Sequence, residues 1–275
     1  MAAALTAVDG VAGVLLGGSR ARGAHTPESD WDLGVYYRGA VDTAELAALA
    51  ARFTGAPVDV AGPGGWGPWV DGGAWLTVDG AAVDWILRDL DRVRRIWEQC
   101  RAGHYEIGVQ PGHPLGFWSP CYPGEVALGQ VLADPGGELR ALRAETAGYP
   151  DALRAALVEA AWEAEFCVTI ARKSAKRGDV THVALCLARA FGVLAQSVHA
   201  EAGVWCLNEK GAVAAAAALP CAPPDFAARV AAVLGRLGAQ GAALVSAVDA
   251  AGVLVAETRT LLAAASTPRP SAPPT

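Results

Sequence analysis

The dominant period of the apolar residues along this 275-residue chain changes near residue 90. Before that point, short apolar or alternating runs such as Val11–Leu16 and Asp30–Tyr37 are separated by glycine-rich turns, a pattern typical of β-strands. From Leu90 onward, apolar residues recur at helical spacing. Strands that are followed by helices predict an α+β fold, in which a small mixed-sheet domain precedes an α-helical bundle domain.

The domain limits follow from the same change of pattern. We expect a sheet domain at residues 1–115, a helical domain at 116–265 and a disordered tail, rich in Pro, Ser and Thr, at 266–275. Gly62–Gly73 is too rich in glycine and proline for regular structure, and we expect a mobile or substrate-covering loop there.

Individual elements are also predicted. The further expected strands are Val58–Val60, Trp75–Val78 and Ala82–Arg88, the last two joined by an Asp-Gly turn. Two helices are expected between Cys121 and Glu145, and one long helix is expected from Pro150 to about Lys176.

Charge and hydropathy limit the class of protein. Lys and Arg total 22 against 28 Asp and Glu, a net charge of −6, and 53% of the residues are hydrophobic. Such a chain buries a core, and it lacks the basic surface with which most nucleic-acid-binding proteins neutralise phosphates. Its start has no basic leader region, and apolar windows such as Ala243–Val255 look too short or too charged to span a bilayer. We therefore expect a cytoplasmic protein without a membrane partner, and the charge favours a small-molecule partner over nucleic acid.

The cysteines do not indicate a metal site or a disulfide framework. Six of them are scattered without a C-x-x-C pair, and the five histidines are equally dispersed. Metal sites and disulfide frameworks are usually recognised by spacing, so reduced, buried thiols are expected.

The segment that indicates chemistry begins directly after the first predicted strand. A glycine pair there, Gly17-Gly18, lets backbone N–H groups approach an anion, and Ser19 adds a hydroxyl donor. Ten residues later, Asp30 and Asp32 stand two apart on a strand, so their carboxylates project from one face. Magnesium prefers a few carboxylates together with phosphate oxygens, and the pattern therefore predicts a site for a metal–nucleoside triphosphate.

A third carboxylate is expected, because a nucleophilic hydroxyl must lose its proton before it attacks phosphorus. Asp84 is the best candidate, since it stands between Val83 and Trp85 in the middle of a predicted strand. Asp59 is the alternative.

These residues resemble the signature of the polymerase-β-like nucleotidyltransferase superfamily, a glycine-serine turn followed by a D-x-D strand. The wording GGSRARG…SDWDLGVYY is most similar to bacterial small-molecule (aminoglycoside-type) and minimal nucleotidyltransferases, over about residues 10–90. The resemblance implies that Gly18 and Ser19 hold the triphosphate, and that Asp30, Asp32 and Asp84 bind two Mg²⁺ ions. It further implies that Asp84 activates the acceptor hydroxyl, and that all three aspartates are catalytic.

Other residues are weaker candidates. Arg20 and Arg22 follow the glycine turn and could clamp phosphates or form ordinary ion pairs. Lys173 and Lys176 either complement a helix dipole or reach the triphosphate from the second domain. We assign Arg22, Lys173 and Lys176 to nucleotide binding.

Acidic and aromatic residues could contact the acceptor. Asp179 is most simply a helix cap, and it stays open as an acceptor contact with Glu163 and Glu165. Tryptophans in or beside the glycine-rich loop could stack on a base or a sugar, or could simply pack: Trp66, Trp69 and Trp75.

The leading hypothesis is transfer of a nucleoside monophosphate from Mg-NTP, such as ATP, to a hydroxyl of a small molecule, with release of pyrophosphate. The resemblance and the acidic charge suggest an aminoglycoside-like antibiotic as acceptor, and hence antibiotic resistance. The alternative is a protein- or tRNA-modifying nucleotidyltransferase of the toxin/antitoxin kind. The acceptor, the preferred base and the choice between monomer and homodimer stay open.

Overall fold

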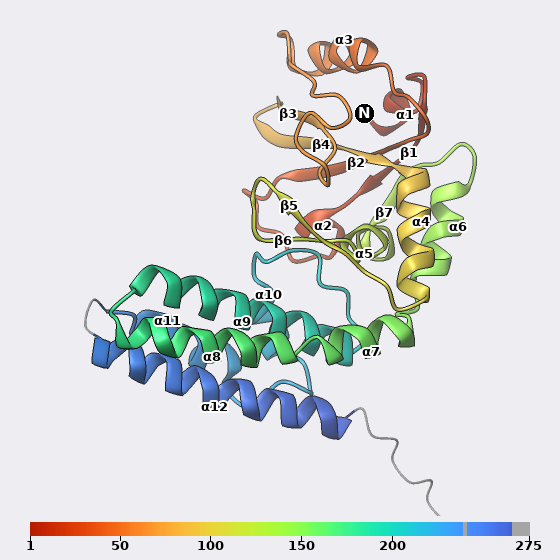
Figure 1. Ribbon diagram of the computed structural model, residues 1–275. Coiled ribbons are helices and arrows are strands. Elements are labelled where there is room, and N and C mark those ends of the chain that lie inside the picture. The colour runs from red at the N-terminus through yellow and green to blue at the C-terminus, as the bar shows by residue number, and fades with distance from the viewer. Residues whose placement is uncertain (239–240, 266–275) are drawn as a thin grey trace, which may run out of the picture. The chain divides into compact units, whose positions relative to one another are not determined.

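The computed structural model describes residues 1–238 and 241–265, and the predicted disordered tail lies outside this range. The chain forms two compact units that divide between Tyr149 and Pro150 (Figure 1). This division falls later than the expected boundary at 115/116. The reason is that a strand at Gln130–Ala133 pairs with the first strand, and two helices around it pack within the same unit.

The first unit is built on a five-stranded mixed sheet, as predicted. Its strand order is β3-β4-β2-β1-β7, with β2 and β4 parallel and the other neighbours antiparallel. The bounds are β1 Val11–Leu16, β2 Trp31–Tyr37, β3 Gly73–Val78, β4 Ala81–Asp89 and β7 Gln130–Ala133. The expected strand at Val58–Val60 is wrong, because only Ala61 forms an isolated bridge, although Val58 and Val60 pack against the core.

One face of the sheet carries the core. Alternate residues such as Leu33, Val35 and Trp85 project from it and pack with α1 (Ala2–Leu5) and α3 (Thr43–Thr54), which lie on this side in Figure 1. Asp42 caps α3 by accepting hydrogen bonds from two backbone N–H groups of its first turn.

The opposite face of the sheet is polar at one end, and at the other end its side chains are buried. Tyr36 of β2 and Arg88 of β4 are buried there, and the Arg88 guanidinium donates to both carboxylate oxygens of Glu125 at 2.7 and 2.8 Å. Burial and the nearby Glu125 carboxylate raise the pKa of Tyr36. Glu125 belongs to α5 (Cys121–Leu128), and α4 (Leu90–Arg101) and α6 (Glu138–Thr146) complete the unit with the hairpin β5–β6. The bounds of the hairpin are Ile107–Gln110 and His113–Trp118.

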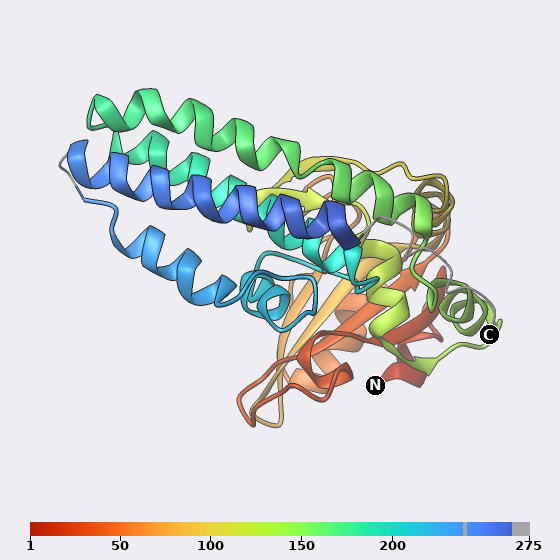
Figure 2. The ribbon, with the colours of Figure 1, turned by 90° about the horizontal axis from the view of Figure 1, so that it is seen from below.

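The second unit is helical, as predicted. Its helices are α7 Asp151–Glu159, α8 Trp162–Lys176, α9 Val180–Glu201, α10 Ala212–Ala217, α11 Phe226–Gly235 and α12 Gly241–Ala265. The single long helix expected from Pro150 to Lys176 is instead two, because a turn at Ala160-Ala161 separates α7 from α8. Figure 2 shows α8 and α12 running side by side.

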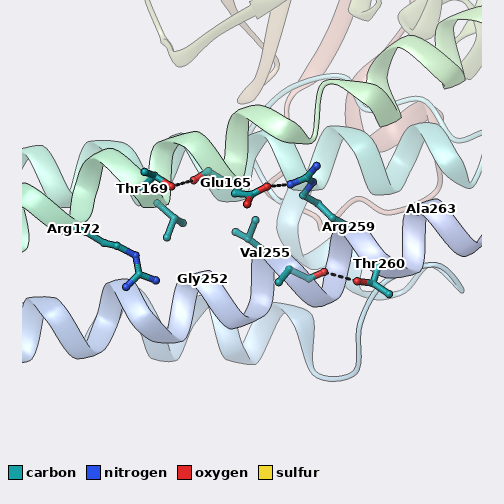
Figure 3. Close-up of a pocket in the computed structure, with 10 residues that line it drawn as sticks. Glu165, Thr169, Arg172, Gly252, Val255, Arg259, Thr260 and Ala263 are labelled. Carbon is teal, nitrogen blue, oxygen red and sulfur yellow. Dashed lines mark hydrogen bonds and ion pairs between the residues drawn. The ribbon is translucent and has the colours of Figure 1, made fainter.

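A groove of about 460 Å³ lies between α8 and α12 (Figure 3). Two ion pairs cross between these helices, Glu165 with Arg259 and Arg172 with Asp249. Glu163 likewise receives two hydrogen bonds from Arg189, and Asp179 caps α9. The acids that were open as acceptor contacts therefore all have structural partners.

Two of the described helices, α9 and α12, are long and apolar enough to cross a membrane by length and composition. The expectation that the window Ala243–Val255 is too short to span a bilayer is thus wrong, because this window is part of a 25-residue helix. In α9, 72% of the most apolar window is buried within the fold, as in the core helix of a bundle. The cytoplasmic location stays a prediction.

The Arg88–Glu125 pair gives a test of the fold. Glu125→Ala leaves the Arg88 guanidinium, only 3% exposed, without its partner. We expect the free energy of unfolding to fall by about 3–5 kcal/mol. Urea unfolding followed by tryptophan fluorescence measures this, since seven of the nine tryptophans lie in the first unit.

The matched control is Glu98→Ala, which removes the exposed pair between Glu98 and Arg101 on α4. Its expected cost is below about 1 kcal/mol. Equal effects of the two substitutions would contradict a special role for the buried pair.

Candidate active site

The glycine turn after β1 is built around Asp32. The Gly17 N–H donates to the Asp32 carbonyl oxygen at 2.8 Å, and Gly18 adopts a left-handed φ of +62°. A Cβ atom at Gly18 would lie 1.8 Å from the Asp32 carboxylate oxygen Oδ2. Only glycine therefore lets the turn approach this carboxylate so closely, and Ser19 follows directly in the short helix α2 (Gly18–Ala21).

The candidate carboxylates meet on the polar face of the sheet. Asp32 on β2 and Asp84 on β4 are register partners in the parallel pair, so their side chains leave the sheet on the same face. Asp30 precedes β2 by one residue. Burial raises the pKa of Asp84 to about 6, with further contributions from the negative charges of Asp32 and Asp30. Asp84 thus interacts electrostatically with both of the other acids.

The competing acid lies elsewhere. Asp59 is exposed and stands outside every strand of the sheet, whereas Asp84 is half-buried within β4. The structure therefore brings Asp84, rather than Asp59, to Asp32.

Arg20 fixes the path of the chain between the two halves of the motif. Its guanidinium donates to the Ser29 carbonyl oxygen at 2.6 and 2.9 Å and lies 4.3 Å from the centre of the Trp31 ring. We infer that Arg20 positions the segment leading to Asp30, instead of clamping a phosphate. Arg22 is exposed and donates from Nε to the Gly18 carbonyl oxygen at 3.1 Å.

Lys173 and Lys176 are exposed on α8, in the second unit. Their assignment to nucleotide binding stays a prediction.

The glycine-rich loop is anchored to the hairpin. The Gln110 side chain on β5 accepts hydrogen bonds from the N–H groups of Trp69 and Val70, and donates to the Trp66 carbonyl oxygen at 2.7 Å. Trp69 stacks on Phe117, and the Arg92 guanidinium lies 4.8 Å from the centre of the Trp69 ring. The expected irregular loop is present, and its backbone is held by the Gln110 amide, by the Arg92 guanidinium at the Pro68 carbonyl oxygen and by the Tyr122 hydroxyl at the Trp69 carbonyl oxygen.

Trp66 and Trp75 have a different environment from Trp69. Their rings stack on each other at 4.3 Å, and both line a cavity of about 340 Å³ that also contains Asp84. The contributions of Gln110 and His113 to this cavity were not predicted, although the Pro111-Gly112 dipeptide between them is a turn signal that could have revealed their hairpin.

The segment that contains the glycine turn matches a known family of domains. Residues 3–68 match the family model of the nucleotidyltransferase domain, which includes the glycine-serine turn and Asp30-x-Asp32. The chain carries a nucleotidyltransferase domain. This segment is similar to the polymerase-β-like nucleotidyltransferases, as the sequence resemblance indicated, and the match supports a transferase activity.

The remaining comparisons are less informative. Residues 124–210 match a domain of unknown function (DUF4037), and no curated protein matches the chain. A solved structure of a nucleotidyltransferase-like protein from Exiguobacterium sibiricum 255-15 is similar at 13% identity and a TM-score of 0.44, over 95% of this chain and 72% of that one. Asp84 lies outside the matched nucleotidyltransferase segment, so its assignment depends on the register of β2 and β4.

Nucleotidyltransferases generally use an NTP and a divalent metal ion. The donor set here fits such an ion, since three carboxylates that repel one another offer only oxygen ligands, which Mg²⁺ prefers. No described group of three or more His, Cys, Asp and Glu side chains forms a preassembled metal cluster. An ion held by a few carboxylates therefore requires additional oxygens, such as those of a triphosphate.

The close approach of Gly18 can be tested with a matched glycine. Gly18→Ala would push the Asp32 carboxylate away, and we expect magnesium–ATP binding, measured by calorimetry, to weaken at least about tenfold. Gly23→Ala introduces the same left-handed strain, at a φ of +68°, but nothing lies within 4 Å of its Cβ position. Comparable loss in both variants would attribute the effect to backbone strain alone.

The raised pKa of Asp84 predicts a cost in stability. Below about pH 4, Asp84 is protonated in both the folded and the unfolded states. Between about pH 4 and pH 6, the folded protein retains a proton that the unfolded chain has released, so the free energy of unfolding falls as the pH rises. Above pH 6 the loss is complete.

Asp84→Asn should therefore stabilise the metal-free protein at pH 8, on the order of 1 kcal/mol because solvent screens a half-buried group. At pH 4 the gain should vanish. Thermal unfolding with a chelator present measures both values, and a gain that is the same at the two pH values would refute the assignment.

Proposed function

We propose that this protein transfers a nucleoside monophosphate from a magnesium-bound nucleoside triphosphate to a hydroxyl group of a small molecule. The observation that supports the proposal is the row formed by Asp32 and Asp84 on neighbouring strands. The glycine-serine turn lies beside Asp32, and the 340 Å³ cavity opens beside Asp84. In this proposal the turn would bind the phosphates on one side of the carboxylates, and the cavity would receive the acceptor on the other.

Separate residues would bind the triphosphate and the metal ions. The backbone N–H groups of Gly18 and Ser19 would bind the triphosphate, and Asp30, Asp32 and Asp84 would hold two Mg²⁺ ions. When bound, these ions neutralise charge on the phosphates and on the attacking oxygen.

Asp84 would take the proton from the acceptor hydroxyl. The hydroxyl oxygen then bonds to the α-phosphorus, the bond from that phosphorus to the bridging oxygen breaks, and pyrophosphate leaves. In the metal-free protein, Asp84 has a pKa of about 6, so it is a stronger base than an ordinary aspartate and is still mostly ionised at neutral pH.

The test is release of pyrophosphate with each of the four common NTPs and a panel of hydroxyl-bearing acceptors that includes aminoglycosides. Mass spectrometry of the acceptors identifies the product. A mass shift on the chain itself, on an added protein or on tRNA, with none on a small molecule, would replace this proposal by the macromolecule-modifying alternative.

Two conservative variants then locate the third carboxylate. Asp84→Asn should lower kcat/KM about a thousandfold, as expected for loss of a general base. The matched variant Asp59→Asn alters an exposed acid outside the sheet and should leave kcat/KM within about twofold. The reverse result would assign the role to Asp59.

A further inference from the structure

The cavity beside Asp84 has an aromatic wall. Trp75 on β3 is the cross-strand partner of Asp84, so the indole and the carboxylate project from the same face of the sheet. Trp66 stacks on Trp75 with an angle of 14° between the rings, and Ile86 adds an aliphatic surface. Trp75 lies on an edge strand and is 68% exposed, a large apolar surface for water to contact.

The polar groups of the cavity wall are largely engaged within the protein. The Gln110 carbonyl oxygen accepts from two backbone N–H groups, and its amide nitrogen donates to the carbonyl oxygens of Trp66 and Pro111. His113 packs edge-on against Phe117, with ring centres 5.1 Å apart. Asp84 is the single charged residue among those that line the cavity.

This lining is unsuited to a polycation. An ammonium group that leaves water needs a carboxylate, a carbonyl oxygen or an aromatic face as its partner, and a polycation needs several such partners at once. The cavity offers one carboxylate, which the proposed reaction uses for metal binding and proton transfer. A flat aromatic molecule, by contrast, finds tryptophan surface to stack on.

The size of the cavity further limits the class of acceptor molecule that it can hold. A volume of about 340 Å³ is near the lower end of the range for small-molecule pockets. It suits a molecule of one to three rings, rather than an oligosaccharide.

We propose that the acceptor is a planar, hydroxylated aromatic compound, which stacks on the Trp66–Trp75 pair and presents its hydroxyl group to Asp84. The identity of the reacting hydroxyl rests on the proposed function, whereas binding in the cavity does not. The two can therefore fail separately.

The experiment uses umbelliferone, a fluorescent planar phenol, as the probe. Its binding to the full chain is titrated by fluorescence anisotropy in the presence of a non-hydrolysable magnesium–ATP analogue. Trp75→Leu should weaken binding about tenfold through loss of stacking and of apolar contact area. Trp75→Tyr retains a stacking ring and should retain most of the affinity.

The matched control is Leu132→Ala. Leu132 is an exposed apolar residue on β7, the strand at the opposite edge of the same sheet, and its removal should leave the affinity unchanged. An unchanged affinity in Trp75→Leu, or displacement of the probe by the polycationic aminoglycoside kanamycin, would overturn the inference.

Turnover separates the inference from the proposed function. Probe binding that depends on Trp75, without pyrophosphate release from any acceptor or NTP, supports the cavity assignment and refutes the proposed function. Nucleotidylation of kanamycin by both the parent protein and Trp75→Leu supports the proposed function and refutes the cavity assignment.

Discussion

The parallel pairing of β2 with β4 is the interaction on which the candidate site depends. Its register sets Asp32 opposite Asp84, and the antiparallel pairing of β3 with β4 then sets Trp75 opposite Asp84. Because side chains alternate between the two faces of a strand, a shift of one residue would turn these groups into the core and expose apolar ones. Leu33, Val35 and Trp85 oppose such a shift, since all three are buried on the other face. The core therefore determines the position of the carboxylates.

Burial of charged groups on the polar face of the sheet costs free energy, and an ion pair reduces this cost at one end of the face. Asp84 has a raised pKa because it is partly buried beside Asp32 and Asp30. Further along the same strand, Arg88 is buried as well, but it forms a two-point ion pair with Glu125 of α5. The Arg88 end of this face is thus neutralised by an ion pair, whereas the pKa of Asp84 at the other end is shifted by burial and by negative charges. An excess of negative charge of this kind suits a metal–nucleotide site, since a bound metal ion brings positive charge to the carboxylates.

The strand faces and the glycine turn of the candidate site could be predicted, because neighbouring residues in the sequence determine them. The alternation around Asp32 and the apolar neighbours of Asp84 revealed which way each carboxylate points, and the glycine pair revealed the turn. The strand β7 was missed because it has four residues and is formed by long-range pairing with β1, which no local period encodes. For the same reason, the division between the units was expected too early. Sequence alone also could not separate Trp69, which packs against Phe117, from the two tryptophans that line the cavity.

In the proposed reaction, the residues that carry out the chemistry and the residues that select the acceptor lie on different parts of the sheet. The carboxylates lie on β2 and β4 or directly before β2, at the interior of the sheet, whereas the aromatic wall comes from the edge strand β3, the glycine-rich loop and the hairpin β5–β6. Substitutions in those peripheral segments could alter the acceptor without moving a carboxylate. The net charge of −6 then says little about the acceptor, since bound metal ions would neutralise much of the charge of the site. The neutral, aromatic surface next to Asp84 is the better guide, because it is what an acceptor would touch.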